Sequence, residues 1–125
     1  MKTILVDAWN TFITEKGINK DLKTLLDSHI NPKIILTNAN QEECLKFGIV
    51  NMPYEVFSLE HQPNKTDKIY FEKFLEQYNL TPQDVIYFEH NIEAVNSAKS
   101  IGIQTFHFNP LASLNNLATF INENI

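Results

Sequence analysis

Residues 3–11 read TILVDAWNT, and this stretch decides the fold. Its apolar, β-branched start predicts a strand buried on both faces, and Asp7 comes near the carboxyl end of that strand. A carboxylate in this position is open to a ligand yet held by a rigid element, which suits a nucleophile. The alternative is a strand-end aspartate that only accepts hydrogen bonds from turn amides.

Similar short apolar runs recur along the chain and alternate with stretches of helical period. We expect strands over residues 3–8, 33–37, 55–59, 84–88 and 104–108, and helices over residues 20–29, 67–78, 92–101 and 111–122. A further helix begins at a capping box formed by Asn40 and Glu43 and ends before Gly48. This alternation predicts a single Rossmann-like α/β domain over residues 1–125, with three α/β/α layers around a five-stranded parallel sheet.

Composition and charge narrow the classes of function. The formal charge is −5 with a pI near 5.3, and no run of lysine forms a basic stripe, so nucleic acid is not an expected partner. Cys44 is the single cysteine, which excludes an internal disulfide and gives no thiolate zinc site. We find neither a secretory signal nor about 18 consecutive apolar residues, so we expect a cytoplasmic protein without a membrane contact.

Polar side chains gather where the predicted strands end. In open parallel sheets these carboxyl ends form the ligand site. Thr37 and Asn38 follow the second strand and could bind a phosphoryl oxygen, although such residues also cap helices. Lys65 precedes the helix over residues 67–78 and could supply positive charge there, or it could be a solvated lysine. His61, in the loop after the third strand, could overlook the same place.

In this order the segments resemble the motifs of the haloacid-dehalogenase-like superfamily. Residues 7–11 are similar to its first motif, DxDxT, except that Trp9 replaces the second aspartate. Residues 34–38 resemble the second motif, a strand that ends in Thr or Ser, and Lys65 matches the lysine of the third. Residues 89–94 occupy the place of the fourth motif, and residues 98–103 match the family's usual close.

The resemblance implies a role for each matched residue. Asp7 would be the nucleophile, assisted by Thr37 and Lys65 as catalytic residues. Mg²⁺ would be held by Asp7, the backbone carbonyl of Trp9, and the fourth-motif residues Glu89 and His90. Substrate would be bound by Trp9, Asn10, Thr11 and Asn38.

Two departures bear on the chemistry that the resemblance implies. Trp9 cannot carry the proton that the second aspartate carries, and losing such a group typically costs on the order of 10²- to 10⁴-fold in rate. His90 stands where an aspartate is expected, whereas Mg²⁺ prefers oxygen ligands. A borderline metal such as Zn²⁺ or Ni²⁺ would suit His90 better, and a hydrogen-bonded histidine without any metal is the alternative.

The resemblance also implies a site without a cap domain. Residues 12–32 suffice for a flap and one helix, and residues 37–65 are too few for the family's other cap. An open site would need a macromolecular substrate or a protein partner as its lid. Dehalogenases of the family carry an aromatic residue at the place of Trp9 and need no Mg²⁺. They use a cap arginine, however, and this chain contains no arginine.

Two functions therefore compete. The first is a weak or specialised hydrolase of phosphatase type that uses Asp7 on a phosphoryl substrate. The second is a catalytically degenerate fold that serves as a protein-binding module. A response-regulator receiver is disfavoured, because receivers begin with an acidic pair and carry the phosphorylated aspartate on the third strand.

Overall fold

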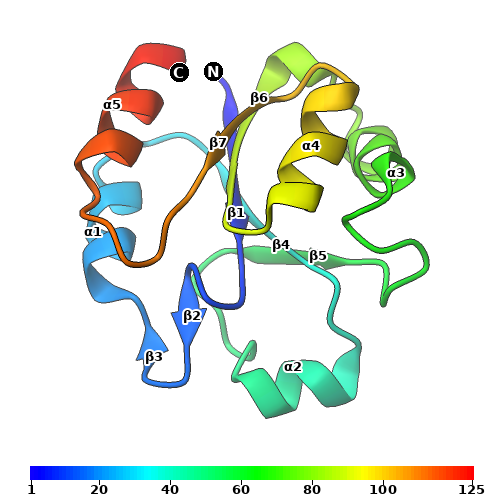
Figure 1. The fold of residues 1–125 in the computed structure, drawn as a ribbon, viewed down its shortest axis with the longest axis horizontal. Coiled ribbons are helices and arrows are strands. Elements are labelled where there is room, and N and C mark those ends of the chain that lie inside the picture. Colours follow the sequence, from blue (N-terminus) through cyan, green and yellow to red (C-terminus); the bar gives the residue numbers. More distant parts are fainter.

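The computed structural model describes residues 1–125 and is built around one sheet of five parallel strands (Figure 1). The central strand β1 (Thr3–Asp7) pairs with β4 (Lys33–Thr37) on one side and with β6 (Val85–Glu89) on the other. The edges are β5 (Glu55–Ser58), next to β4, and β7 (Gln104–His107), next to β6. The predicted fold class is confirmed.

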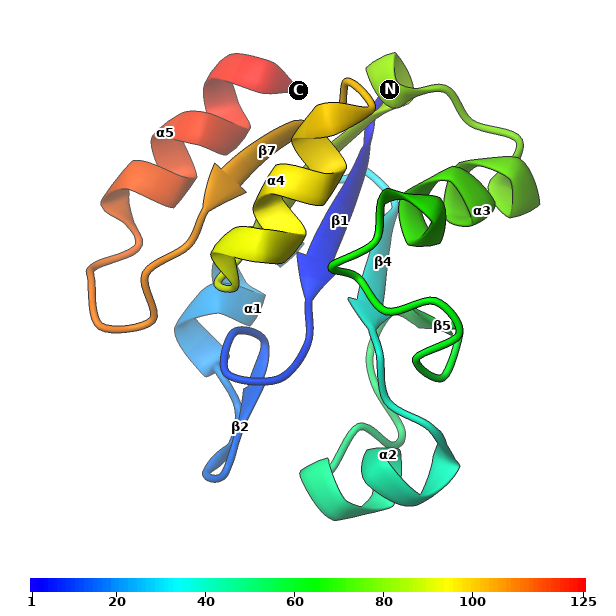
Figure 2. The same ribbon diagram turned by 45° about the vertical axis from the view of Figure 1, so that its right-hand side comes forward.

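Helices cover both faces of the sheet, which gives the three predicted layers (Figure 2). The pair α1 (Lys20–Asp27) and α5 (Asn115–Asn124) packs on one face, and α3 (Lys68–Tyr78) and α4 (Ile92–Ser100) pack on the other. A short 3₁₀ turn over Pro82–Asp84 precedes β6. None of the helices has the length and apolar character that crossing a membrane would require.

Only small elements lie beyond the carboxyl ends of the strands. Between β1 and α1 there is a hairpin of β2 (Ile13–Thr14) and β3 (Gly17–Ile18), which is the expected flap. The helix α2 (Gln41–Phe47) follows β4 and buries none of its residues fully. Neither insertion is a cap domain. Both chain termini lie at the opposite end of the sheet (Figure 1).

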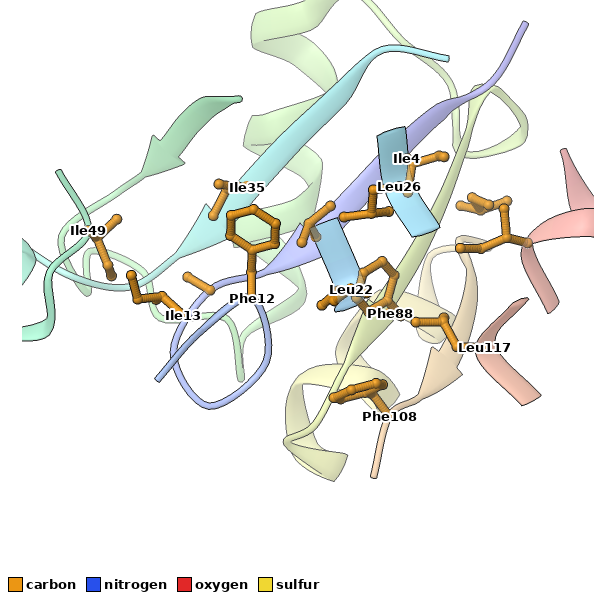
Figure 3. Packing of buried hydrophobic residues seen from close by; sticks show 14 of the residues in the cluster. Ile4, Phe12, Ile13, Leu22, Leu26, Ile35, Ile49, Phe88, Phe108 and Leu117 are labelled. Carbon is orange, nitrogen blue, oxygen red and sulfur yellow. The ribbon is translucent and has the colours of Figure 1, made fainter. Parts of the chain in front are cut away.

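The core is divided by the sheet, because side chains of a strand alternate between its faces. Ile4 and Val6 of β1 pack with Leu22 and Leu26 of α1 in one cluster, while Leu5 belongs to the other cluster. Figure 3 shows the first cluster, where Phe12 of the turn after β1 is fully buried. Burial on both faces makes β1 a rigid base for Asp7.

Several predicted boundaries shift by a few residues. β6 runs over Val85–Glu89 rather than 84–88, so Glu89 belongs to the strand and not to the loop after it. The last helix begins at Asn115 rather than at residue 111, and Leu111 is 96% exposed. The start and stop signals of α2 are confirmed, with a capping box between Asn40 and Glu43 and a left-handed Gly48 at φ 75°.

Candidate active site

The carboxyl ends of β1, β4 and β6 meet at one edge of the sheet and form the floor of a cavity of about 180 Å³. The helix α2 and the loop between β5 and α3 supply the rest of its wall. Predicted site residues that line it are Asp7, Trp9, Thr37, Asn38, His61, Lys65, Glu89 and His90. Residues that come from four separate segments of the sequence are therefore brought together, as the topology predicts.

Asp7 lies at the centre of the site with its side chain only 2% exposed. Its Oδ1 is 2.8 Å from Lys65 Nζ, and its Oδ2 accepts hydrogen bonds from Thr11 Oγ1 at 2.7 Å and from the backbone N–H of His90 at 3.3 Å. Burial alone would raise the pKa of Asp7. The charge of Lys65 and the hydrogen bond from the His90 ring outweigh burial and hold this pKa well below its ordinary value. Asp7 is therefore an anion at neutral pH.

Lys65 is the cation that joins the two buried carboxylates. Its Nζ lies 2.8 Å from Asp7 Oδ1, 2.8 Å from Glu89 Oε1 and 3.2 Å from the carbonyl oxygen of Leu36, so its three protons all have acceptors. Burial disfavours its charge, but the two carboxylates raise the pKa of Lys65 above its ordinary value. Asn38 fixes the backbone beside it, because Asn38 Oδ1 accepts from the N–H of Lys65 at 2.7 Å.

Glu89 is buried beside Asp7 and is supported by a residue that sequence reasoning missed. The hydroxyl of Tyr87 donates to Glu89 Oε1, and the N–H of Asn91 donates to Glu89 Oε2 at 3.0 Å. Burial raises the pKa of Glu89, and Lys65 counteracts only part of that rise. Tyr87 could have been found from the strand period, since residues two apart on a strand point to the same side. The expected end of that strand at residue 88 hid the relation.

His90 is held in the site by its hydrogen bonds to Asp7. Its Nδ1 forms a hydrogen bond with Asp7 Oδ2 and lies 3.3 Å from Glu89 Oε2. Because Asp7 is ionised, Nδ1 carries the proton and donates it. This bond raises the pKa of His90 above its ordinary value, although partial burial opposes the rise. We call Asp7, Lys65, Glu89 and His90 the buried charge cluster.

The other predicted residues differ in how closely they approach the cavity. Thr37 is buried at its floor, where Oγ1 accepts from the N–H of Ala39 at 3.2 Å. Thr11 is buried behind Asp7 and holds its carboxylate, so it acts as a positioning residue. Asn10, expected to bind substrate, does not line the cavity; it is exposed at a turn with φ 65°. Trp9 stacks on Phe47 of α2 with ring centroids 4.6 Å apart, and both rings line the cavity.

A second set of polar groups lines the same cavity from α2 and from the loop between β5 and α3. His61 Nε2 is 2.8 Å from Glu43 Oε1, and His61 Nδ1 is 3.1 Å from Asn64 Nδ2. We call Glu43, His61 and Asn64 the His61 group. His61 was only a loose candidate from the sequence, and Glu43 was recognised there only as a helix-capping residue. The pairing of Glu43 and His61 joins residues 18 positions apart and has no sequence signal.

The donor set is a poor match to Mg²⁺. Ligand atoms of Asp7, Glu89 and His90 lie within 4.8 Å of one another, but all four carboxylate oxygens already accept hydrogen bonds from protein groups. Mg²⁺ demands near-octahedral oxygen ligands, and Ala94 offers none at the second acidic position of the fourth motif. Glu93, the acidic residue next to Ala94, is exposed and does not line the cavity. The residues present therefore do not fit Mg²⁺ as they are arranged.

Comparison with known proteins gives structural matches only. A scan against protein-family models found no match, and neither did a search of curated proteins. A haloacid-dehalogenase-family enzyme from Bacteroides thetaiotaomicron, an aspartate-to-alanine variant in complex with magnesium and inorganic phosphate, superposes with a TM-score of 0.74 at 12% identity. The match covers 94% of this chain and 98% of that one.

Two further solved structures are similar over nearly their whole length. The core domain of a Streptococcus pneumoniae protein provisionally named a phosphoglycolate phosphatase has a TM-score of 0.64 at 13% identity, covering 97% of this chain and 95% of that one. A Thermotoga maritima protein provisionally named a β-phosphoglucomutase has a TM-score of 0.63 at 15% identity, covering 96% and 91%. The chain has the fold of the haloacid-dehalogenase-like superfamily, without a cap domain.

Proposed function

We propose that the protein is a hydrolase of phosphatase type in which Asp7 attacks a phosphoryl group. The fold is that of known phosphatase-like enzymes, which supports the class of reaction. The observation that carries the proposal is the ionised Asp7 at the end of a rigid strand, paired with Lys65 at 2.8 Å inside a cavity. A carboxylate in this state is a nucleophile without needing a base to activate it.

The reaction follows from the contacts around Asp7. An oxygen of Asp7 attacks phosphorus while the bond from phosphorus to the leaving-group oxygen breaks, which gives an aspartyl-phosphate. Water then attacks the phosphorus, inorganic phosphate leaves, and the electron pair returns to the Asp7 carboxylate. Both oxygens of Asp7 already accept hydrogen bonds, Oδ1 from Lys65 and Oδ2 from Thr11 and His90, so the attacking oxygen must give up a hydrogen bond before it can bond to phosphorus.

Three residues suit the transferred phosphoryl group. Lys65 offsets its negative charge from the cavity, where burial strengthens the effect of a fixed cation. The side-chain oxygen of Asn38 accepts from the N–H of Lys65. The side-chain nitrogen of Asn38 is therefore left to donate to a phosphoryl oxygen. The hydroxyl of Thr37 provides a further donor from the neighbouring position.

Whether turnover depends on a metal has to be measured. The similar magnesium-bound structure supports Mg²⁺ by resemblance, whereas the donor set of this chain does not suit it. Turnover should be measured with a chelator and then with Mg²⁺, Zn²⁺ and Ni²⁺ in turn, since His90 favours the borderline metals.

The test is hydrolysis of p-nitrophenyl phosphate by the purified protein and by Asp7→Asn. We expect turnover in the wild type and none in the variant, because an amide is not nucleophilic. Asp21→Asn is the matched control, since Asp21 is an exposed aspartate in the first turn of α1. Equal turnover in Asp7→Asn, or no wild-type turnover under any metal condition, would overturn the proposal.

One observation favours the second candidate, a degenerate site that binds a protein. Every oxygen of Asp7 and Glu89 already has a partner within the molecule, so the cluster is closed without a substrate. In this second candidate, the open cavity accepts a partner protein. In the enzyme, a macromolecular substrate would cover the cavity as a lid. A partner whose association survives Asp7→Asn, combined with absent turnover, would favour binding over catalysis.

A further inference from the structure

The proposed reaction needs a group that transfers protons, and the position of the family's second aspartate holds Trp9. Water must lose a proton as it attacks the aspartyl-phosphate, and the leaving-group oxygen must gain one. Six titratable side chains line the cavity: Asp7, Glu43, His61, Lys65, Glu89 and His90. The proton-transfer group should be among them.

Four of the six belong to the buried charge cluster and are committed to one another. Lys65 gives all its protons to acceptors in the protein, and Glu89 is engaged through both oxygens. His90 donates to Asp7, which is the nucleophile itself. A proton removed from Lys65 or His90 would leave the carboxylates of Asp7 and Glu89 with less positive charge beside them. Only Glu43 and His61 remain.

The hydrogen bonds of His61 fix the position of its proton. Asn64 Oδ1 accepts from the N–H of Thr66 at 3.1 Å, so the atom of Asn64 that faces His61 Nδ1 is the donating nitrogen. Nδ1 therefore carries a lone pair, and Nε2 carries the proton and donates it to Glu43 Oε1. An imidazole with a free lone pair on one nitrogen and a carboxylate on the other is the arrangement of a general base held by an orienting group.

The backbone around His61 has a conformation that the surrounding structure must hold in place. Glu60 and His61 both have positive φ angles, 52° and 66°, in a region that costs side-chain-bearing residues energy. Such conformations persist where the surrounding structure enforces them. Glu43 is itself fixed, because the same Oε1 accepts from the N–H of Asn40 in the capping box of α2.

We infer that His61, oriented by Glu43, is the proton-transfer residue of this site, an inference that rests on the proposed phosphatase reaction. His61 Nδ1 takes a proton from the water that attacks phosphorus, in place of its hydrogen bond to Asn64. The bond from phosphorus to Asp7 breaks, and the imidazolium is stabilised by Glu43. It then gives its proton to the next leaving-group oxygen or to solvent.

The charged groups around the imidazole are few. Glu43 contacts it from α2, and Lys46 lies further along the same helix. Glu60 precedes it in its own loop, and Asp7, Lys65, Glu89 and His90 line the same cavity. Replacing His61 should therefore change how the rate depends on pH.

The decisive variant is His61→Gln, compared with the wild type in p-nitrophenyl phosphate hydrolysis from pH 5 to pH 9. Glutamine can donate to Glu43 and accept from Asn64, as the neutral imidazole does, but it cannot take a proton. We expect kcat to fall by about 100-fold or more, the pH profile to differ from that of the wild type, and aspartyl-phosphate to accumulate. His29→Gln, on the connection between α1 and β4, is the matched control and should keep the wild-type profile.

The outcomes separate this inference from the proposed function. A wild type that hydrolyses the substrate and a His61→Gln that matches it in kcat and pH profile would overturn the inference alone, because the dyad would then only join the loop to α2. Partial recovery of His61→Gln by added imidazole, with unchanged binding of inorganic phosphate, would support it. A wild type without turnover would overturn both.

Discussion

The two walls of the cavity are built in opposite ways. In the buried charge cluster, Asp7, Lys65 and Glu89 are each no more than 7% exposed and sit on strands and on the entry to α3, while His90, just after β6, is 30% exposed. In the His61 group, the side chains of His61 and Glu43 are 44% and 33% exposed and sit on a loop and on α2, a helix without a fully buried residue. Removing a partner is costly in the first wall and mild in the second.

This difference matches the two tasks of a phosphoryl-transfer site. A nucleophile and its counter-ion must be held in one geometry, which burial achieves because every charge then needs its partner. A proton-transfer group must exchange protons with water, which exposure permits. Substitutions in each wall should therefore have effects of different size.

The strongest test of the buried wall is Lys65→Met. Methionine keeps much of the apolar stem but leaves Asp7 and Glu89 facing each other without a cation, so we expect a loss of roughly 3–5 kcal/mol in the free energy of unfolding. Urea denaturation followed by circular dichroism measures it. Lys23→Met removes an exposed ion pair with Asp27 and is the control, with a change that the titration barely resolves. A similarly small change for Lys65→Met would mean that Asp7 and Glu89 do not depend on the charge of Lys65.

The second test is Trp9→Asp, which places a carboxylate at the position of the family's second aspartate. In the His61→Gln background it should restore turnover by about 100-fold, because an acid–base group typically contributes that much or more. In the wild type the gain should stay below about tenfold, since His61 already transfers the proton. Trp9→Asn removes the same ring from Phe47 without adding a carboxylate and is the control.

A large gain from Trp9→Asp in the wild type would contradict the role of His61. It would show that the rest of the site is intact but that no residue of the native chain moves the proton. No gain in either background would instead count against the phosphatase reaction itself.

The third test concerns the pH dependence of the bond between His90 and Asp7. The pKa of His90 is raised in the folded protein, so the bond stabilises the fold fully below the unfolded value of about 6.5 and loses this effect as pH rises through the folded pKa. His90→Asn should therefore lower stability by about 1.5 kcal/mol at pH 5.5 and by less at pH 9. Thermal unfolding at both pH values measures the difference, and a difference that grows with pH would contradict the assignment.

The smallest expected effect is at the base of the exposed wall. Asn40→Ala removes the hydrogen bond that the N–H of Glu43 donates to Asn40 Oδ1 at 2.8 Å, and a lost cap of this kind typically costs about 1 kcal/mol. Because α2 buries none of its residues fully, the loss should appear as faster hydrogen exchange in α2 while β1 stays protected. Equal exchange changes in both elements would show that the two walls are coupled more tightly than their burial indicates.

Much of the fold and part of the site could be predicted from the sequence. Apolar runs with β-branched residues located all five strands, and the Asn40 and Glu43 spacing located the start of α2. Asp7, Thr37 and Asn38 were expected to lie together because strand ends in a parallel sheet share one edge, and Lys65 was expected there from its place before a helix; all four line the cavity. Asn10 and Thr11 were expected to bind substrate but do not line it, since a motif position does not say which side of a turn a side chain takes.

The sequence by itself determined the architecture and the position of Asp7, because periodicity and strand-end position depend on neighbours along the chain. Only the tertiary structure decided the charge state and the partners. Lys65 lies 58 positions from Asp7 and 24 from Glu89, and His61 lies 18 from Glu43. Burial and hydrogen bonding shift the pKa values of Asp7, Lys65 and Glu89, and no local pattern encodes these shifts.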